Sequence, residues 1–146
     1  MTDVVGSIDA DLWHATTVAI GDAGVLITGP AGSGKSALAL QLMALGAQLV
    51  ADDQTCLATT NAGILASAPR MLRGLIEARF VGILTAPVRD SVTLRLVVDL
   101  GQVEASRLPP RRTIRVNGRV IDLVFGHPSA HFSSSLVCYV AGGRHQ

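Results

Sequence analysis

A glycine-rich segment carries the clearest chemical signal in this sequence. Residues 29–36 match the phosphate-loop pattern G-x-x-x-x-G-K-[S/T] in full. The glycines let the backbone curve closely around a phosphate group, and successive N–H groups then point at the anion. Lys35 is expected to reach the β- and γ-phosphate oxygens, and the Ser36 hydroxyl to ligate the Mg²⁺ that bridges them. The predicted site for ATP and Mg²⁺ comprises Gly29, Pro30, Ala31, Gly32, Ser33, Gly34, Lys35 and Ser36.

The lysine of this segment stands out in the composition. Of the twelve lysine and arginine residues in the chain, only Lys35 is a lysine. A compact ammonium on a flexible stem suits a phosphate cradle better than a planar guanidinium does. The choice of residue at position 35 therefore favours phosphate binding.

Two adjacent acids, Asp52 and Asp53, follow a predicted strand over Ala47–Ala51. In parallel-sheet folds, the carboxyl end of a strand lies beside the ligand crevice. Because adjacent residues of a strand point in opposite directions, we expect at most one of the two to face the γ-phosphate. A carboxylate there would accept a proton from an attacking hydroxyl or hold Mg²⁺ through water. A solvated turn or a helix cap is the structural alternative.

Two further residues have side chains suited to the same chemistry. Glu77 lies among apolar neighbours, where a carboxylate needs a partner, and the sequence leaves open a salt bridge to Arg79 or ligation of Mg²⁺. His14 precedes the first predicted strand. A lone histidine is usually a surface or cap residue, so the type of residue at position 14 assigns no role by itself.

Hydrophobic patterning and turn signals predict the elements that must position these residues. An apolar strand precedes the glycine-rich loop and a helix follows it, with Gly46 as the C-terminal stop. Helices are predicted over Ser36–Leu45 and Ser129–Val140, and strands over Thr16–Ile20, Gly24–Thr28, Ala47–Ala51, two parts of Gln54–Ala68, part of Leu75–Leu84, Ser91–Leu100, Thr113–Val116 and Arg119–Val124. This pattern predicts an α/β fold, with a strand-rich mixed sheet around the loop helix.

Composition narrows the class of protein. The chain has 146 residues, of which 49% are hydrophobic, and a formal net charge of +1. We therefore expect one domain over residues 1–146 with an aliphatic core, and no nucleic-acid partner. Because no signal peptide or membrane-length apolar stretch is present, we expect a cytoplasmic protein without a membrane partner. Cys56 and Cys138 are expected to be reduced, buried thiols.

A local basic stretch follows the long predicted strand. It contains Arg107, Arg111, Arg112, Arg115 and Arg119. Such a stretch is typical of a solvated face, and contact with an anion or an acidic partner is the alternative.

Taken together, several of these motifs resemble the catalytic domain of the HPr kinase/phosphorylase family. The resemblance rests on His14, the loop at 29–36, the Ala51-Asp52-Asp53 ending and the segment 76–83, Ile-Glu-Ala-Arg-Phe-Val-Gly-Ile. The spacings from His14 to Lys35 and from Lys35 to Asp53 are similar to those of the family, without a gap. The segment at 76–83 departs from the family signature at Phe80, where a glycine is usual.

The resemblance implies a fold, an activity and a role for each matching residue. The implied fold is a phosphate-loop (Walker A) nucleotide-binding domain, and the implied activity is ATP-dependent phosphorylation of a serine on the phosphocarrier HPr, which regulates the phosphotransferase system. Lys35 would bind phosphate, and Ser36 and Glu77 would hold Mg²⁺. Asp53 would accept the seryl proton, and His14 and Arg107 would complete the catalytic set.

The same resemblance implies an extent for the domain, and other interpretations of its function remain open beside it. It implies a single catalytic kinase domain over 1–146, without the N-terminal regulatory domain of longer members, and leaves open dephosphorylation of HPr and assembly into a homo-oligomer. Two other classes remain alternatives: a small-molecule phosphate-loop kinase with a lid formed by Arg107–Arg119, and an ATP-binding regulatory module that transfers nothing.

Overall fold

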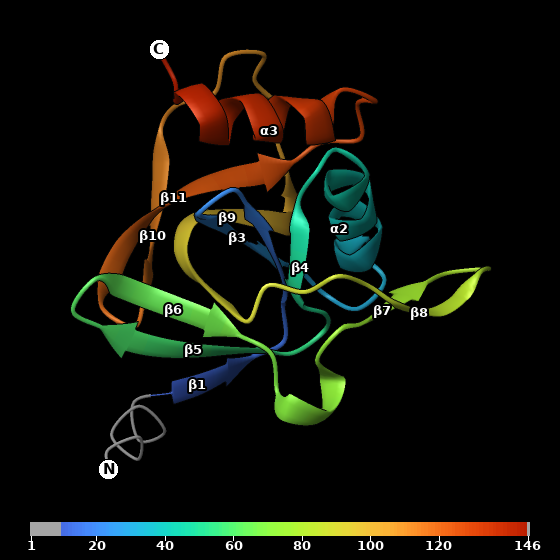
Figure 1. The fold of residues 1–146 in the computed structure, drawn as a ribbon. Coiled ribbons are helices and arrows are strands. Elements are labelled where there is room, and N and C mark those ends of the chain that lie inside the picture. The colour runs from blue at the N-terminus through green and yellow to red at the C-terminus, as the bar shows by residue number, and fades with distance from the viewer. Residues whose placement is uncertain (1–9, 146) are drawn as a thin grey trace.

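The computed structural model describes residues 10–145, which form one curled sheet with two α-helices packed against it (Figure 1). Nine strands within those residues belong to this sheet, and two more form a separate hairpin. The strands are β1 (Ala10–Trp13), β2 (Thr16–Ile20), β3 (Ala23–Thr28), β4 (Gln48–Ala51), β5 (Thr55–Thr60), β6 (Gly63–Ser67), β7 (Leu75–Ala78), β8 (Gly82–Thr85), β9 (Ser91–Val103), β10 (Arg112–Val116) and β11 (Arg119–Gly126). The helices are α2 (Lys35–Ala44), the 3-10 turn η1 (Arg70–Leu72) and α3 (Phe132–Gly142).

The direction of the central strands places the glycine-rich loop and the acid pair at one edge. β3 and β9 pair in parallel, and β11 pairs in parallel with β9. β2 is antiparallel to both β3 and β4, so β3 and β4 run in the same direction. The carboxyl end of β3 leads into the loop at 29–34, and the carboxyl end of β4 leads into Asp52. The two segments that carry chemistry therefore leave the sheet on the same side.

Helix α2 follows the expected pattern, with one difference. Leu38 and Leu42 are buried against the sheet, one turn of helix apart. Leu45, the last residue of the predicted helix, is half exposed because the helix has already ended there. Gly46 has φ 109° and its N–H donates to the carbonyl of Met43, which confirms its role as the C-terminal stop.

The remaining predicted helices and strands are present, but most of them begin or end at other residues than predicted. The two strands predicted within Gln54–Ala68 pair as a hairpin, and so do those on either side of Asn117-Gly118, where both residues have positive φ, as a tight hairpin turn requires. The final helix starts three residues later than predicted. The segment around Glu77 is a hairpin of two strands, β7 and β8, where one strand was expected. β1, which pairs with β5, is a strand that the sequence did not predict.

Two aliphatic clusters pack on opposite faces of the sheet. The first lies beneath α2 and α3 and includes Val18, Ile27, Leu96 and Leu136. The second lies between the central strands and the β5–β6 arm, and it includes residues such as Leu57. Figure 1 shows α3 lying across β11 on the side of the sheet that also carries α2. The helix pair thus covers one face, and the curl of the sheet covers the other.

A β-bulge interrupts the pairing of β3 with β9. Gly24 pairs with Leu94, whereas the next residue, Val25, pairs with Leu96, so Arg95 is the extra residue. A bulge bends its strand and redirects the side chain of the inserted residue. Arg95 is exposed, although both of its neighbours on β9 are buried.

The bulge also leaves no room for a side chain at Gly24. A Cβ added there would lie 2.8 Å from the carbonyl oxygen of Thr93 and 2.8 Å from a methyl carbon of Val92. We expect Gly24→Ala to lower the free energy of unfolding by about 2 kcal/mol, because backbone on β9 would have to move. Urea denaturation of both forms measures the difference.

Gly142→Ala is the matched control for that substitution. A Cβ at Gly142, on the last turn of α3, would meet nothing within 4 Å. It should leave stability unchanged or slightly raised, because alanine is the better helix former. Equal stabilities for the two variants would contradict the close approach at Gly24.

Two composition-based expectations can be compared with the structure. Among residues 10–145, no helix is long and apolar enough to cross a membrane. Both cysteines are free thiols, as predicted. Cys56 is only partly buried, and this burial raises the pKa of its thiol above the usual value. Cys138 is exposed on α3, so the expectation of two buried thiols was wrong.

Candidate functional site

The loop between β3 and α2 has the backbone geometry of an anion cradle. Gly29, Gly32 and Gly34 have φ of 145°, 82° and 99°, values that side-chain-bearing residues rarely adopt. A Cβ on Gly29 would lie 2.6 Å from the hydroxyl oxygen of Ser33, so this glycine is also required for space. Gly34 precedes α2 without any side-chain cap. The first N–H groups of α2 therefore remain open to an anion.

Lys35 is a buried cation without a carboxylate partner among the described residues. Its side chain is 7% exposed, and Nζ donates to the carbonyl oxygens of Gly29 at 2.7 Å and Pro30 at 3.1 Å. No acid within residues 10–145 forms a salt bridge with it. A buried charge is costly unless it is paired, so an anion in the loop would be strongly favoured.

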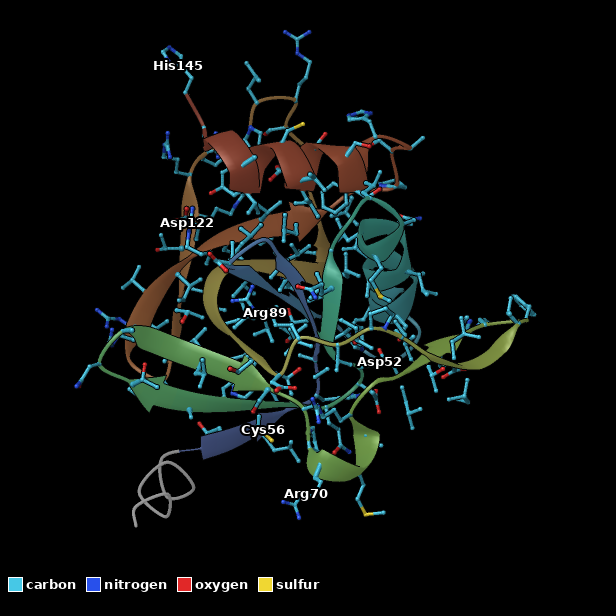
Figure 2. The ribbon with its side chains drawn as sticks, in the orientation of Figure 1. Asp52, Cys56, Arg70, Arg89, Asp122 and His145 are labelled. Atoms are coloured by element: carbon cyan, nitrogen blue, oxygen red, sulfur yellow. The ribbon has the colours of Figure 1, made fainter. Side chains whose placement is uncertain are left out.

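Asp52 ties four segments of the site together. Its Oδ1 accepts hydrogen bonds from the hydroxyls of Ser36 at 2.6 Å and Thr16 at 3.0 Å. Its Oδ2 accepts from the backbone N–H of Glu77 at 3.1 Å. Asp52 is only 8% exposed, so both of its oxygens are used inside the protein. Figure 2 labels Asp52 between the base of α2 and the β7–β8 hairpin.

Asp53 faces the opposite way from Asp52 and lines a pocket beside the glycine-rich loop. Its Oδ1 lies 2.7 Å from Nε2 of His14, and both side chains are more than half exposed. Its backbone N–H donates to the hydroxyl of Thr16, so Thr16 fixes both acids at once. The backbone of Asp53 has φ 68°, a conformation that Asp and Asn adopt more readily than other side chains. Of the two acids, Asp53 lines this pocket and Asp52 does not, and the expectation that at most one of them faces the γ-phosphate stays a prediction.

The loop, Asp53 and the β7–β8 hairpin enclose a pocket of about 500 Å³. That volume is within the range of small-molecule sites. Residues from three segments of the chain line it: Ala31, Gly32, Gly34, Lys35, Ser36, Ala37, Leu40, Asp53, Glu77, Ala78, Arg79 and Val81. Five of the eight predicted loop residues are therefore brought together with Asp53 and Glu77, whereas Gly29, Pro30 and Ser33 are not among the lining residues.

Glu77 differs from its expected environment. It is exposed on β7 and forms no salt bridge with Arg79 or any other described residue, so of the two partners considered the salt bridge is absent. Within residues 10–145, no group of three or more His, Cys, Asp or Glu side chains could hold a metal ion. The Ser36 hydroxyl and the Glu77 carboxylate still suit Mg²⁺, because this ion usually takes one or two protein carboxylates or hydroxyls, several waters and substrate phosphates.

The structure separates Arg107 from the pocket and brings Arg79 to it. Arg107 is exposed in the segment between β9 and β10 and is not among the pocket-lining residues, so its catalytic role stays a prediction. Arg79 was considered only as a partner for Glu77. Arg79 lies in the turn that follows β7, two residues after Glu77, and no pattern in the sequence indicated that it would line the pocket.

Removing the carboxylate of Asp52 should destabilise the whole site. Asp52→Ala would leave two hydroxyls and one backbone N–H without their acceptor, the Thr16 hydroxyl in a buried position and the other two in partly buried ones. We expect the free energy of unfolding to fall by about 3 kcal/mol. Asp52→Asn, which keeps one acceptor oxygen, should lose less. Chemical denaturation tests the order, and an unchanged midpoint for Asp52→Ala would contradict the anchoring role.

Phe80 occupies a strained position at the tip of the β7–β8 hairpin. Its φ is 72°, and the N–H of Val81 donates to the carbonyl of Ala78, so Phe80 is the third residue of a turn in which glycine is preferred. The side chain is 99% exposed and gains little from packing. We expect Phe80→Gly to raise stability by about 1 kcal/mol, measured as a higher melting temperature. A lower melting temperature would contradict this assignment of strain.

Comparisons with known proteins agree with this geometry. The model of the family described as HPr Serine kinase C-terminal domain matches residues 9–118. The chain is 41% identical over 98 residues to HPr kinase/phosphorylase of Bordetella pertussis, covering 59% of this chain and 32% of the relative. It is 42% identical over 102 residues to that of Aromatoleum aromaticum, covering 61% and 33%. The chain therefore spans about a third of the length of these relatives.

A solved structure extends the likeness to the fold. The structure of the Hpr(Ser) kinase/phosphatase from Coxiella burnetii superposes with a TM-score of 0.76 at 28% sequence identity, covering 90% of this chain and 88% of that one. The strand-rich mixed α/β fold predicted from the sequence is thus shared with that enzyme. Because the family model covers most of the chain and the fold agrees, this chain belongs to the family of HPr serine kinase C-terminal domains.

Proposed function

We propose that this chain is an ATP-dependent kinase domain that phosphorylates a seryl hydroxyl on HPr or an HPr-like carrier. One observation supports it most directly: a single pocket combines an anion cradle, an unpaired buried lysine and an accessible carboxylate. Membership in the family and the names of the relatives support the choice of acceptor. Regulation of the phosphotransferase system and a cytoplasmic location belong to the same proposal.

The glycine-rich loop would bind the phosphates of ATP. The N–H groups at the start of α2 and the ammonium of Lys35 supply positive charge in a partly desolvated position, where electrostatic stabilisation is strongest. Lys35 would exchange its two carbonyl contacts for phosphate oxygens. These contacts would hold the γ-phosphate at a fixed place beside Asp53. Such positioning supplies much of the catalytic effect in phosphoryl transfer.

The donors near the loop are suited to Mg²⁺. The Ser36 hydroxyl donates its proton to buried Asp52, which leaves its oxygen lone pairs free to ligate a cation. Glu77 lines the same pocket and has no described salt-bridge partner. When bound there, Mg²⁺ would neutralise charge on the phosphate oxygens.

Asp53 would act as the general base. The seryl oxygen forms a bond to the γ-phosphorus as the bond from that phosphorus to the β–γ bridging oxygen breaks, and the seryl proton passes to Asp53. His14 holds the carboxylate through its 2.7 Å contact, and Arg79 adds positive charge at the rim. In dephosphorylation of the carrier, an oxygen of the attacking phosphate or water would bond to the phosphorus as the bond from phosphorus to the seryl oxygen breaks, and Asp53 would return its proton to that seryl oxygen.

The experiment is phosphotransfer from γ-labelled ATP to a purified HPr-like carrier, with Mg²⁺ present. We expect label on the carrier, and none on a carrier whose acceptor serine is replaced by alanine. Binding of ATP without labelling would contradict the proposal. Running the reaction from the phosphorylated carrier tests the reverse direction.

The same assay separates the alternatives. Label on small hydroxylated acceptors, but not on the carrier, would identify a small-molecule kinase. Nucleotide binding without transfer to either would identify a regulatory module. Sedimentation of the active sample would determine whether a homo-oligomer forms.

A further inference from the structure

A second, smaller pocket lies at the end of α3 and shares no residue with the nucleotide pocket. It has a volume of about 150 Å³ and is lined by Arg95, Leu96, Arg111, Asp122, Tyr139, Val140, Gly143 and Arg144. Figure 2 labels Asp122 on β11 beneath α3, well away from Asp52. Three of the eight lining residues are arginines, and one is an acid.

The first arginine reaches the pocket because of the β-bulge. Arg95 is the residue skipped in the pairing of β3 with β9, and its side chain is exposed. None of the described residues forms a hydrogen bond or salt bridge with its guanidinium. An arginine that is turned outward by a bulge and left without a protein partner has five donors available to a ligand.

The other two arginines are placed by contacts between distant segments. Arg144 donates to the carbonyl oxygen of Pro109 at 2.7 Å, and Arg111 donates to the carbonyl oxygen of Arg144 at 3.2 Å. These contacts join the segment before β10 to the end of α3. Both contacts use backbone carbonyl oxygens as acceptors.

The acid in the pocket is already engaged. One oxygen of Asp122 accepts a hydrogen bond from the Tyr139 hydroxyl at 2.7 Å. Burial first, and then this hydrogen bond, raise the pKa of Tyr139 above its usual value, so the phenol stays neutral. The lining side chains therefore carry three positive charges against one negative charge.

We propose that this pocket binds a phosphate group, either as inorganic phosphate or as the phosphoryl group of a small phosphorylated molecule. Arginine guanidinium groups suit phosphate because paired N–H donors match its oxygens. The volume is small and favours one such group over a nucleotide. A hollow of about 410 Å³ adjoins it at Arg95 and Val140, where the organic part of a monoester would lie. The proposal is independent of the proposed function, because Tyr139 and Arg144 lie beyond the family match at 9–118.

The test is a titration with inorganic phosphate followed by two-dimensional NMR of the full chain. A non-hydrolysable ATP analogue with Mg²⁺ is present throughout to occupy the glycine-rich loop. We expect saturable shifts of the amide signals of Leu96 and Gly143. A parallel titration with glycerol phosphate distinguishes the two sources, because tighter binding of the monoester would place its organic part in the adjoining hollow.

Two arginine substitutions decide the assignment. Arg95→Gln should weaken phosphate binding by about tenfold or more, since it removes a charge-assisted contact without breaking any described one. Arg115→Gln is the control: it removes the same charge from exposed β10, outside the pocket, and should change the affinity less than twofold. Equal effects of the two variants, or shifts confined to the loop glycines, would overturn the proposal.

Discussion

Replacing Lys35 with alanine is expected to lower kcat/KM for phosphotransfer by at least about 10²-fold. Lys35 is the only lysine in the chain, and its Nζ donates hydrogen bonds to the carbonyl oxygens of Gly29 and Pro30 in the loop. Its removal takes away the charge that would meet the β- and γ-phosphates. Transfer of label to the carrier and calorimetric binding of the ATP analogue measure the two consequences.

The loss should not come from unfolding. Lys35 is buried and, within residues 10–145, its Nζ contacts backbone oxygens and no acid, so alanine removes a desolvated charge without unpairing a described carboxylate. A melting temperature equal to or above that of the wild type is therefore expected. Lys35→Arg is the informative companion, because it keeps the charge but not the compact shape. Undiminished ATP affinity in Lys35→Ala would show that the loop does not bind nucleotide through this residue.

Asp53→Asn is expected to lower the transfer rate by about 10²- to 10⁴-fold while leaving ATP affinity nearly unchanged. Asparagine removes the base but retains the size of the side chain. It also tolerates the φ of 68° at this position, which makes it a cleaner test than alanine. Single-turnover transfer from labelled ATP measures the chemical step.

A surface acid provides the control for that substitution. Asp22 is highly exposed in the β2–β3 turn, forms an ion pair with Arg89 and does not line the nucleotide pocket, so Asp22→Asn should transfer at the wild-type rate. A fall in ATP affinity that accounted for the whole loss in Asp53→Asn would contradict a role as base. A rate equal to that of Asp22→Asn would exclude it.

Local signals in the sequence predicted much of the fold because they depend on short stretches of chain. The glycine-rich loop, the helix after it and the Asn117-Gly118 hairpin each need a backbone conformation that particular residues favour. β1 gave no comparable signal, because its four residues gain stability only by pairing with β5, more than forty positions away. The β7–β8 hairpin was not predicted, because Phe80 holds a turn position at which glycine is preferred, and so the sequence gives no turn signal there.

The tertiary structure decides which of the two acids is buried and which lines the pocket. The sequence predicted that Asp52 and Asp53 would point in opposite directions, and the resemblance to the family favoured Asp53. Which acid points inward is decided by Thr16, whose hydroxyl contacts both, and by Ser36 from a separate helix. Hydrogen bonds between residues far apart in the chain have no pattern in a single sequence.

The sequence by itself determined which residues form the glycine-rich loop and that they match the phosphate-loop pattern, because that pattern lies in adjacent positions. Only the tertiary structure decided which distant groups share its pocket: Arg79 rather than Arg107 among the arginines considered, and Glu77 exposed without a salt bridge. The pocket at the end of α3 is of the same kind. Its arginines come from a bulge, a loop and a C-terminal segment that meet only when the chain has folded.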